Sequence, residues 1–555
     1  MKDTVKNSKA FVRIPRAPVR ECSLIVPPEL EAWLSAFRRT AVGAASRAKS
    51  AALSCNSKNI SLLTRYCMRW YKAHPCSALP NDKEPGFTVI HAPVLRRLHE
   101  EVLKSNFYQE VSTTELAPER WKEEYGKLCT RVAKAAEQPH LASDLFRSSG
   151  ICGARASAAL ILNAKTHKSS AEFRNVHAGG SSVFAGLGIW LCRELQSVVD
   201  EWDHLLPSCS AFSEWARTIE IRPGDYMVRV DVKHFFMSGQ PSVIANLASS
   251  LLPIQKRRVY EDALLWLLHN QFVESEYLPG RAFRVCRGTG MGLQFSGPAA
   301  DLAFLAKCEI DFALRLGTRC AHGVRHYKRF KDDIFIIASD HTGTRQWYRS
   351  LQRAAAPVFE LQVEEVSNIE VTMLSMLVTI NGIRLETRPK PQPMAMALGH
   401  GSGHHHSVHS KWPRAYLRNL AQLCSNRDYI WPACTEFVAR MKRSGAPAEL
   451  LDDLHGRIQG VVDAWPNFAP TGPRQRRDGL VWLILKHHPS LRASGFARAV
   501  RQFLQDPFWA STAQILKFED LVRVGVGYAN PSRHFYVQAR NTRAVHDCIF
   551  PRGGI

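Results

Sequence analysis

The sequence predicts an α+β fold built around a ferredoxin-like sheet, and three stretches carry that prediction. Residues 225–236 (DYMVRVDVKHFF) alternate apolar and polar side chains, which is typical of a half-buried strand. Residues 326–340 (HYKRFKDDIFIIASD) predict two short strands joined by an acidic turn. Helical patterning at 242–270 and 344–359 follows each of these units. Together they give the β-α-β-β-α-β order of a ferredoxin-like sheet.

The remaining elements follow in chain order. A largely helical region is expected over 28–150, interrupted at 79–90 by a turn and a short strand. Residues 156–180 predict two strands around a basic turn. Residues 363–387 predict further strands with an Asn-Gly hairpin turn. Beyond 390 the chain becomes basic, His-rich and helical, which predicts a separate lobe.

Composition limits the class of protein. The 555 residues include 73 Lys or Arg and 50 Asp or Glu, a formal charge of +23 with a pI near 9.6. The length suggests roughly three to four units of about 150 residues. A hydrophobic content of 45% excludes a disordered chain, and no apolar run is long enough to span a membrane. The 14 scattered cysteines indicate reduced thiols in an intracellular compartment. The charge favours a polyanionic partner, nucleic acid first and an anionic membrane surface second.

Three carboxylates are the strongest candidates for chemistry. Asp231 lies inside a predicted strand, and Asp332 and Asp333 are adjacent in a predicted turn. Such placements destabilise a fold unless something compensates, and two Mg²⁺ ions held by carboxylates would do so. For either site alone, an edge residue or a solvated turn is the commoner explanation. The apolar flanks MVRV and IFII argue against that explanation.

Two further features lie between these carboxylates. Phe236 could sit under the sugar of a nucleotide and exclude a 2′-hydroxyl, or simply pack in the core. The loop GTGMGLQFSGP at 288–298 lets the backbone approach a flat or anionic ligand closely. It matches neither a P-loop nor a Rossmann fingerprint.

Taken together, DVKHFF, GTGMGLQFSGPAADL and FKDD occur in the order and spacing of the palm motifs of reverse transcriptases. The chain resembles that superfamily, and most closely the Penelope-like retroelements, which are relatives of telomerase. LPNDKEPGFTVI resembles the upstream motif of that group, and KTHK and FRNV resemble its fingers motifs. Residues 388–426 resemble its thumb. The similarity covers about 79–430.

The resemblance implies a right-hand polymerase fold and an RNA-directed DNA polymerase. The implied regions are an N-terminal helical extension (1–78), fingers with helical insertions (79–224), a palm with a ferredoxin-like sheet (225–385), a helical thumb (386–460) and a C-terminal helical extension (461–555). The implied reaction adds dNTPs to a DNA primer on an RNA template with two Mg²⁺ ions, Mn²⁺ being a possible substitute. A nuclear location is expected, without a membrane partner, and the oligomeric state is left open.

The resemblance also implies residue roles. The catalytic carboxylates would be Asp231, Asp332 and Asp333, and the metal ligands Asp231, Asp332 and Val232. The nucleotide-binding residues would be Lys83, Lys165, Arg174, Phe236, Gly290, Met291, Gly292 and Gln294. The residues that contact primer and template would be Lys390, His406, Lys411, Arg414 and Arg418.

The sequence departs from the family pattern at three points. Phe330 stands where Tyr or Ala is usual, and Met-Leu-Ser-Met at 373–376 replaces the usual primer-grip residues. A GIY-YIG endonuclease motif is not found, so target cleavage would come from another protein. Two alternatives therefore stay open: an RNA-dependent RNA polymerase, against which the aromatic Phe236 argues, and a non-catalytic nucleic-acid-binding descendant, which the intact carboxylates disfavour.

Overall fold

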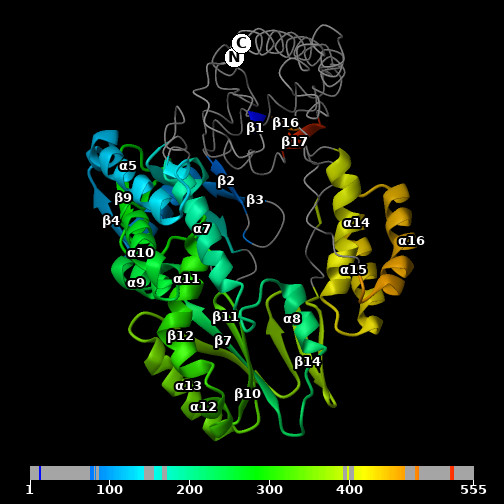
Figure 1. The fold of residues 1–555 in the computed structure, drawn as a ribbon. Helices are drawn as coiled ribbons and strands as arrows, with labels where there is room; N and C mark the ends of the chain where they lie inside the picture. Colours follow the sequence, from blue (N-terminus) through cyan, green and yellow to red (C-terminus); the bar gives the residue numbers. More distant parts are fainter. Residues whose placement is uncertain are drawn as a thin grey trace, which may run out of the picture.

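The fold is described from a computed structural model (Figure 1). The structure describes residues 87–142, 155–165, 172–391 and 406–468, with the short segments 12–13, 76–80, 82, 145, 397–398, 482–486 and 525–529. Lys83 and part of the helical region expected over 28–150 lie outside these residues.

The centre of the fold is a four-stranded antiparallel sheet, called here the palm sheet, with the order β10-β11-β7-β12. Its chain order is β-α-β-β-α-β, as the sequence predicts for a ferredoxin-like sheet. The strands are β7 (Tyr226–Lys233), β10 (Val324–Phe330), β11 (Asp333–Ala338) and β12 (Glu360–Ser367). The helices between them are α9 (Pro241–Ser250), α10 (Ile254–His269), α11 (Ser296–Phe304), a π-helical segment (Leu305–Ala313), α12 (Leu316–Ala321) and α13 (His341–Ala355).

The two faces of the palm sheet enter different cores, because successive side chains of a strand point to opposite sides. Val228 and Val230 of β7 pack in the larger core under the helices. Met227 of β7 and Phe335 of β11 pack in a second core with Phe212. That second core is closed by α8 (Cys209–Ala216) and by a three-stranded sheet of β13 (Glu370–Met373), β14 (Met376–Asn381) and β15 (Arg384–Pro389).

The hairpin expected in this region is present. β14 and β15 pair antiparallel around the turn that contains Gly382, whose φ of +58° is one that glycine adopts without strain. The Met-Leu-Ser-Met stretch forms the preceding turn, and Met373 and Met376 on its two sides are fully buried. These methionines therefore serve the second core.

A second sheet has five strands in the order β4-β9-β8-β5-β6. β5 and β6 form the expected hairpin, whereas β8 and β9 come from within the range predicted as palm and pair with β5 and β4. The elements of this lobe are β2 (Cys76–Pro80), β3 (Phe87–His91), α4 (Ala92–Leu103), β4 (Tyr108–Val111), α5 (Pro118–Ala135), β5 (Ser157–Ala164), β6 (Phe173–Ala178), α7 (Ala185–Val199), β8 (Phe272–Glu274) and β9 (Ala282–Val285).

A bundle of three helices follows the palm: α14 (His406–Gln422), α15 (Ile430–Arg443) and α16 (Ala448–Ala464). It is anchored on β15 through the buried Thr387. The Thr387 N–H donates to Ser425 Oγ at 2.7 Å, and the Thr387 hydroxyl donates to the Leu423 carbonyl at 2.9 Å. The expected boundary at 385/386 thus falls inside β15, a strand that belongs to the second core and also holds the bundle.

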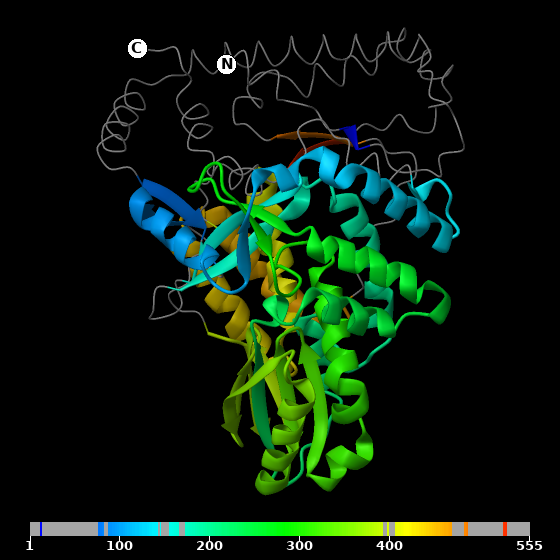
Figure 2. The ribbon, with the colours of Figure 1, turned by 90° about the vertical axis from the view of Figure 1, so that its left-hand side faces the viewer.

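The five-stranded lobe and the α14–α16 bundle rise from opposite sides of the palm sheet in Figure 1. Figure 2 gives the same arrangement from the side, with the lobe standing in front of the bundle. A further sheet joins β1 (Val12–Arg13), β16 (Trp482–Lys486) and β17 (Gly525–Ala529), so the described parts of the outermost extensions include strands. Among the described helices, none is long and apolar enough to cross a membrane.

Candidate active site

The three aspartates lie together at one end of the palm sheet. Asp333, the first residue of β11, is the direct cross-strand partner of Asp231 in β7. Opposite residues in an antiparallel pair have their Cβ atoms about 4.5–5.5 Å apart on one face. Asp332 lies beside them, because its carbonyl accepts a hydrogen bond from the Val232 N–H at 2.9 Å. Backbone pairing therefore brings together the residues that the sequence predicts as catalytic.

These carboxylates sit where the second core ends. Asp231 and Asp333 share the face of Met227 and Phe335, but they are only partly buried. Arg229 lies on the same face, with its Nη1 atom 3.6 Å from Asp333 Oδ1. The guanidinium also pairs with Glu364 and, at 3.1 Å, with Glu365 of β12. One cation is thus shared among several carboxylates.

The electrostatic consequence appears at Asp333. Burial raises the pKa of its carboxyl from 3.8 to about 7, and the negative charge of Asp332 acts in the same direction. Asp231 adds to the rise, while Arg229 opposes it without cancelling it. The Asp333 carboxyl therefore keeps its proton to a higher pH than an ordinary aspartate does.

This donor set suits Mg²⁺ or Mn²⁺, since both prefer carboxylate oxygens. Among the described residues, no three His, Cys, Asp or Glu side chains form a ready-made metal site. Mg²⁺ is commonly held by one or two carboxylates together with substrate phosphates. Asp231 and Asp332 would be such ligands. Val232 has a buried side chain, so only its backbone carbonyl could contribute.

The Gly-rich loop is packed against the backbone of the predicted sugar gate. The Thr289 N–H donates to the Phe236 carbonyl at 2.6 Å, and the Gly288 N–H donates to the Gly239 carbonyl at 2.9 Å. Gly288 has a φ of +69°, and a Cβ there would lie 2.2 Å from the Phe236 carbonyl oxygen. The Phe236 side chain is partly buried and packs edge-on against Phe235. The absence of a side chain at Gly288 thus allows the loop backbone to approach the backbone of Phe236 closely.

The other side of the loop contacts β6 of the five-stranded sheet. The His177 N–H donates to the Met291 carbonyl at 2.7 Å. A Cβ at Gly290 would lie 2.4 Å from His177 Nδ1 and 2.7 Å from Gln271 Oε1, and a Cβ at Gly292 would lie 2.8 Å from the His177 carbonyl oxygen. The predicted nucleotide residues of this loop therefore form the link between the palm and the five-stranded lobe.

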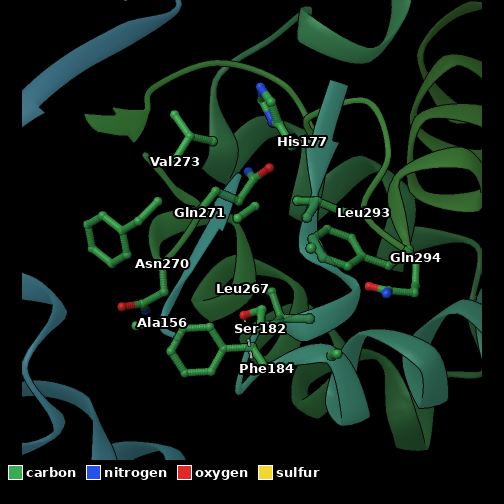
Figure 3. Close-up of a pocket in the computed structure, with 15 residues that line it drawn as sticks. Ala156, His177, Ser182, Phe184, Leu267, Asn270, Gln271, Val273, Leu293 and Gln294 are labelled. Atoms are coloured by element: carbon green, nitrogen blue, oxygen red, sulfur yellow. Dashed lines mark hydrogen bonds between the residues drawn. The ribbon is translucent and has the colours of Figure 1, made fainter. Parts of the chain in front are cut away.

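A small cavity lies beside this link (Figure 3). Gln294 is the predicted site residue that lines it, together with His177 and Gln271. His177 is fully buried, which lowers its pKa to about 4, so the imidazole is neutral at physiological pH. Its Nε2 atom lies 3.0 Å from the Tyr108 hydroxyl. Sequence reasoning missed His177 and Gln271, since no local pattern marks either one.

The basic residues predicted for the triphosphate lie on the β5–β6 hairpin and have carboxylate partners. Lys165 Nζ is 3.2 Å from Glu172 Oε2, and Arg174 Nε is 3.2 Å from Asp82 Oδ1. The Asp82 N–H donates to the Ala164 carbonyl at 2.8 Å, which places the segment preceding Lys83 against the same hairpin. Lys83 itself lies outside the described residues.

The residues predicted to contact primer and template lie directly after the end of β15 and on α14. Lys390, Lys411, Arg414 and Arg418 are exposed. Arg414 Nε is 2.8 Å from Asp453 Oδ2 of α16, and the Arg418 guanidinium lies over the Phe468 ring. Two of these cations thus also hold the bundle together. His406 begins α14.

Replacing Gly288 with alanine should destabilise the site. The positive φ and the contact with the Phe236 carbonyl make Gly288→Ala cost about 1–3 kcal/mol, measured as a lower thermal unfolding temperature. Gly317→Ala is the matched control, because nothing lies within 4 Å of its Cβ position and its φ is not positive. The control should be neutral or slightly stabilising. Equal effects of both variants would contradict this account.

Asp333 should make metal-free stability depend on pH. Between pH 4 and 7 the folded state holds a proton that the unfolded state has lost, so stability falls as pH rises. Relative to Asp333→Asn, the wild type should lose about 1.4 kcal/mol per pH unit between pH 5 and 7 and level off above that. Thermal unfolding in EDTA measures this. The surface variant Asp262→Asn should follow the wild type, and parallel curves for Asp333→Asn would disprove the expectation.

Comparisons with known proteins leave the family open. No protein-family model and no curated protein matches this chain. The telomerase from Candida albicans, in complex with a fragment of telomeric RNA, is similar at 9% identity and a TM-score of 0.45 over 80% of this chain and 73% of that one. The apo telomerase from Candida tropicalis is similar at 11% identity and a TM-score of 0.32, over 75% of this chain and 75% of that one. An RNA polymerase complex inside a double-stranded RNA virus is similar at 12% identity and a TM-score of 0.34, over 70% of this chain and 33% of that one. This chain therefore spans about a third of that protein. At such low TM-scores, none of these similarities bears on activity.

Proposed function

We propose that this chain is a template-directed nucleotidyltransferase, and specifically an RNA-directed DNA polymerase that extends a primer 3′-end with dNTPs. The observation that carries the proposal is the placement of Asp231, Asp332 and Asp333 side by side at the end of a ferredoxin-like sheet. Phe236 follows strand β7 closely in the chain, and the Gly-rich loop, which follows β9, bonds to its backbone carbonyl. The motifs DVKHFF, GTGMG and FKDD support a retroelement enzyme of the Penelope-like type, acting in the nucleus.

The chemistry follows from the charge of the site. Divalent ions held by Asp231 and Asp332 would lower the pKa of the primer hydroxyl and offset the charge of the departing pyrophosphate. The carboxylates of this chain would supply the oxygen ligands for such ions. Arg229 keeps part of that charge compensated when Asp333 is ionised.

The remaining residues would orient the substrate. The Gly-rich loop holds the backbone of Phe236, because the Thr289 N–H and hydroxyl both donate to the Phe236 carbonyl. Phe236 would select the sugar of the incoming nucleotide. Lys165 and Arg174 would bind the triphosphate by exchanging Glu172 and Asp82 for phosphate oxygens. Such an exchange keeps each cation paired with an anion and releases the carboxylates of Glu172 and Asp82.

Primer extension tests the proposal directly. Purified protein should extend a DNA primer on an RNA template with Mg²⁺ or Mn²⁺, and Asp332→Asn should reduce the rate by about 100-fold or more, because an uncharged amide binds these ions poorly. Asp262→Asn is the control, as it removes only an exposed pair with Arg131. No extension by the wild type, or wild-type extension by Asp332→Asn, would reject the function.

Sugar selection separates a DNA polymerase from an RNA polymerase. If Phe236 excludes the 2′-hydroxyl, Phe236→Ala should raise the ratio of rNTP to dNTP incorporation by about tenfold or more. Phe312→Ala is the matched control, because Phe312 is also partly buried against the larger core but packs near Trp347. A wild type that prefers rNTPs would instead favour the RNA-dependent RNA polymerase. Nucleic-acid binding without turnover would favour the non-catalytic descendant.

A further inference from the structure

A fully buried arginine lies three residues before the acidic turn. Arg329 of β10 has no exposed surface, and its guanidinium is enclosed by two carboxylates. Nη1 is 2.9 Å from Asp301 Oδ1, Nε is 2.9 Å from Glu309 Oε1, and Nη2 is 2.8 Å from Glu309 Oε2. Asp301 belongs to α11, the helix that follows the Gly-rich loop, and Glu309 to the π-helical segment after it.

The same cluster reaches the residue next to Asp332. Arg329 Nη1 donates to the Lys331 carbonyl at 3.0 Å, and the Lys331 ammonium pairs with Asp301 Oδ2. Lys331 has a φ of +55°, a left-handed conformation that is unfavourable for a residue with a side chain. Its two anchors, one on the backbone and one on the side chain, offset that cost. Asp301 therefore uses one oxygen for Arg329 and the other for Lys331.

The cluster also borders the sugar gate. The Arg329 guanidinium lies over the Phe304 ring, 4.8 Å from its centroid, and 5.7 Å from the centroid of Phe235. Phe235 directly precedes Phe236. A single buried group thus touches the helix after the Gly-rich loop, the residue before the gate and the acidic turn.

Stability alone is a weak reason for such a cluster. A buried ion pair loses about as much in desolvation as it gains in attraction, and apolar residues often replace it without loss. What the cluster supplies is a fixed orientation, because both oxygens of each carboxylate are engaged. Asp301 binds Arg329 with one oxygen and Lys331 with the other. Glu309 binds Arg329 with both oxygens, and its Oε1 also accepts from the Tyr327 hydroxyl at 2.7 Å. The cluster is also balanced, with the cations Arg329 and Lys331 against the carboxylates of Asp301 and Glu309, so the turn is held without adding net charge beside Asp332.

We propose that Asp301 is a positioning residue for the metal-binding turn: by pairing with Lys331 it holds Asp332 beside Asp231, and so couples the helix after the Gly-rich loop to the metal site. The inference rests on the proposed function for its use of metal ions. Asp301 binds no metal itself in this account and acts only through Lys331 and Arg329.

The discriminating variant is Asp301→Asn. An asparagine oxygen can still accept from Arg329, whereas its amide nitrogen cannot accept from the Lys331 ammonium. The substitution therefore removes one of the two links and leaves the other. Lys331→Met removes the same link from the other side, and its partly exposed position makes it tolerable should Asp301→Asn fold poorly. The double variant completes the cycle.

The matched control lies at the other end of the same strands. Asp225, just before β7, has a buried carboxylate that pairs with Arg325 of β10. Asp225→Asn removes a buried, arginine-paired carboxylate of the same sheet but leaves the acidic turn untouched. It should lower the unfolding temperature without changing metal affinity.

The readout is the dissociation constant for Mn²⁺, measured by titration with primer–template present, alongside the Mn²⁺ concentration that half-saturates extension. Asp301→Asn and Lys331→Met should each raise both by about tenfold, as loss of residues that orient metal ligands typically does. Both substitutions remove the same Asp301–Lys331 ion pair, so the Mn²⁺ affinity of the double variant should equal that of each single variant. Recovery of wild-type affinity in the double variant would mean that only charge balance matters, and would overturn the proposal.

Two further outcomes would also overturn it: wild-type Mn²⁺ affinity in folded Asp301→Asn, or an equal loss in Asp225→Asn. The failure of the proposed function is distinguishable. A wild type that extends no primer rejects the polymerase, while the Mn²⁺ titration still decides whether Asp301 positions the turn. A wild type that binds no Mn²⁺ rejects both.

Discussion

The antiparallel pairing of β7 with β11 is the constraint on which the site depends. It places Asp333 opposite Asp231, and the turn before β11 then has to put Asp332 beside Val232. Two negative charges on neighbouring strands are unfavourable, so this pairing is tolerable only where both side chains reach past the second core. Burial raises the pKa of the Asp333 carboxyl, and the charges of Asp332 and Asp231 add to the rise. The same placement of carboxylates that lowers the stability of the fold would be stabilised by a bound cation.

The Gly-rich loop extends this constraint to the rest of the molecule. It meets Phe236 at Gly288 and β6 at Gly290 and Gly292, in each case through backbone approaches that a Cβ would block. Contacts of this kind are short and directional, and they leave little freedom for either partner to shift. The loop therefore ties β6 of the five-stranded sheet to the backbone of Phe236, the residue that the sequence predicts as the sugar gate.

The sequence allowed the local parts of this architecture to be predicted. The strand that contains Asp231, the Asp332–Asp333 turn and the Gly382 hairpin each have a pattern within a dozen residues. Partners distant in the chain could not be predicted in the same way. The β8–β9 hairpin joins a sheet whose other strands lie more than 90 residues earlier in the chain, and α8 packs under the palm although it precedes it. Single charged residues such as Arg329 and His177 carry no periodic signal, so their burial became visible only in three dimensions.

The formal charge of +23 gains a different meaning from the structure. Arg329 and Lys331 lie close to the acidic turn, and carboxylates of α11 and the π-helical segment pair with them. Arg229 faces Asp333 and is divided among several acids. Part of the positive charge is therefore used inside the fold, in ion pairs that fix the acidic turn and the strands beside it.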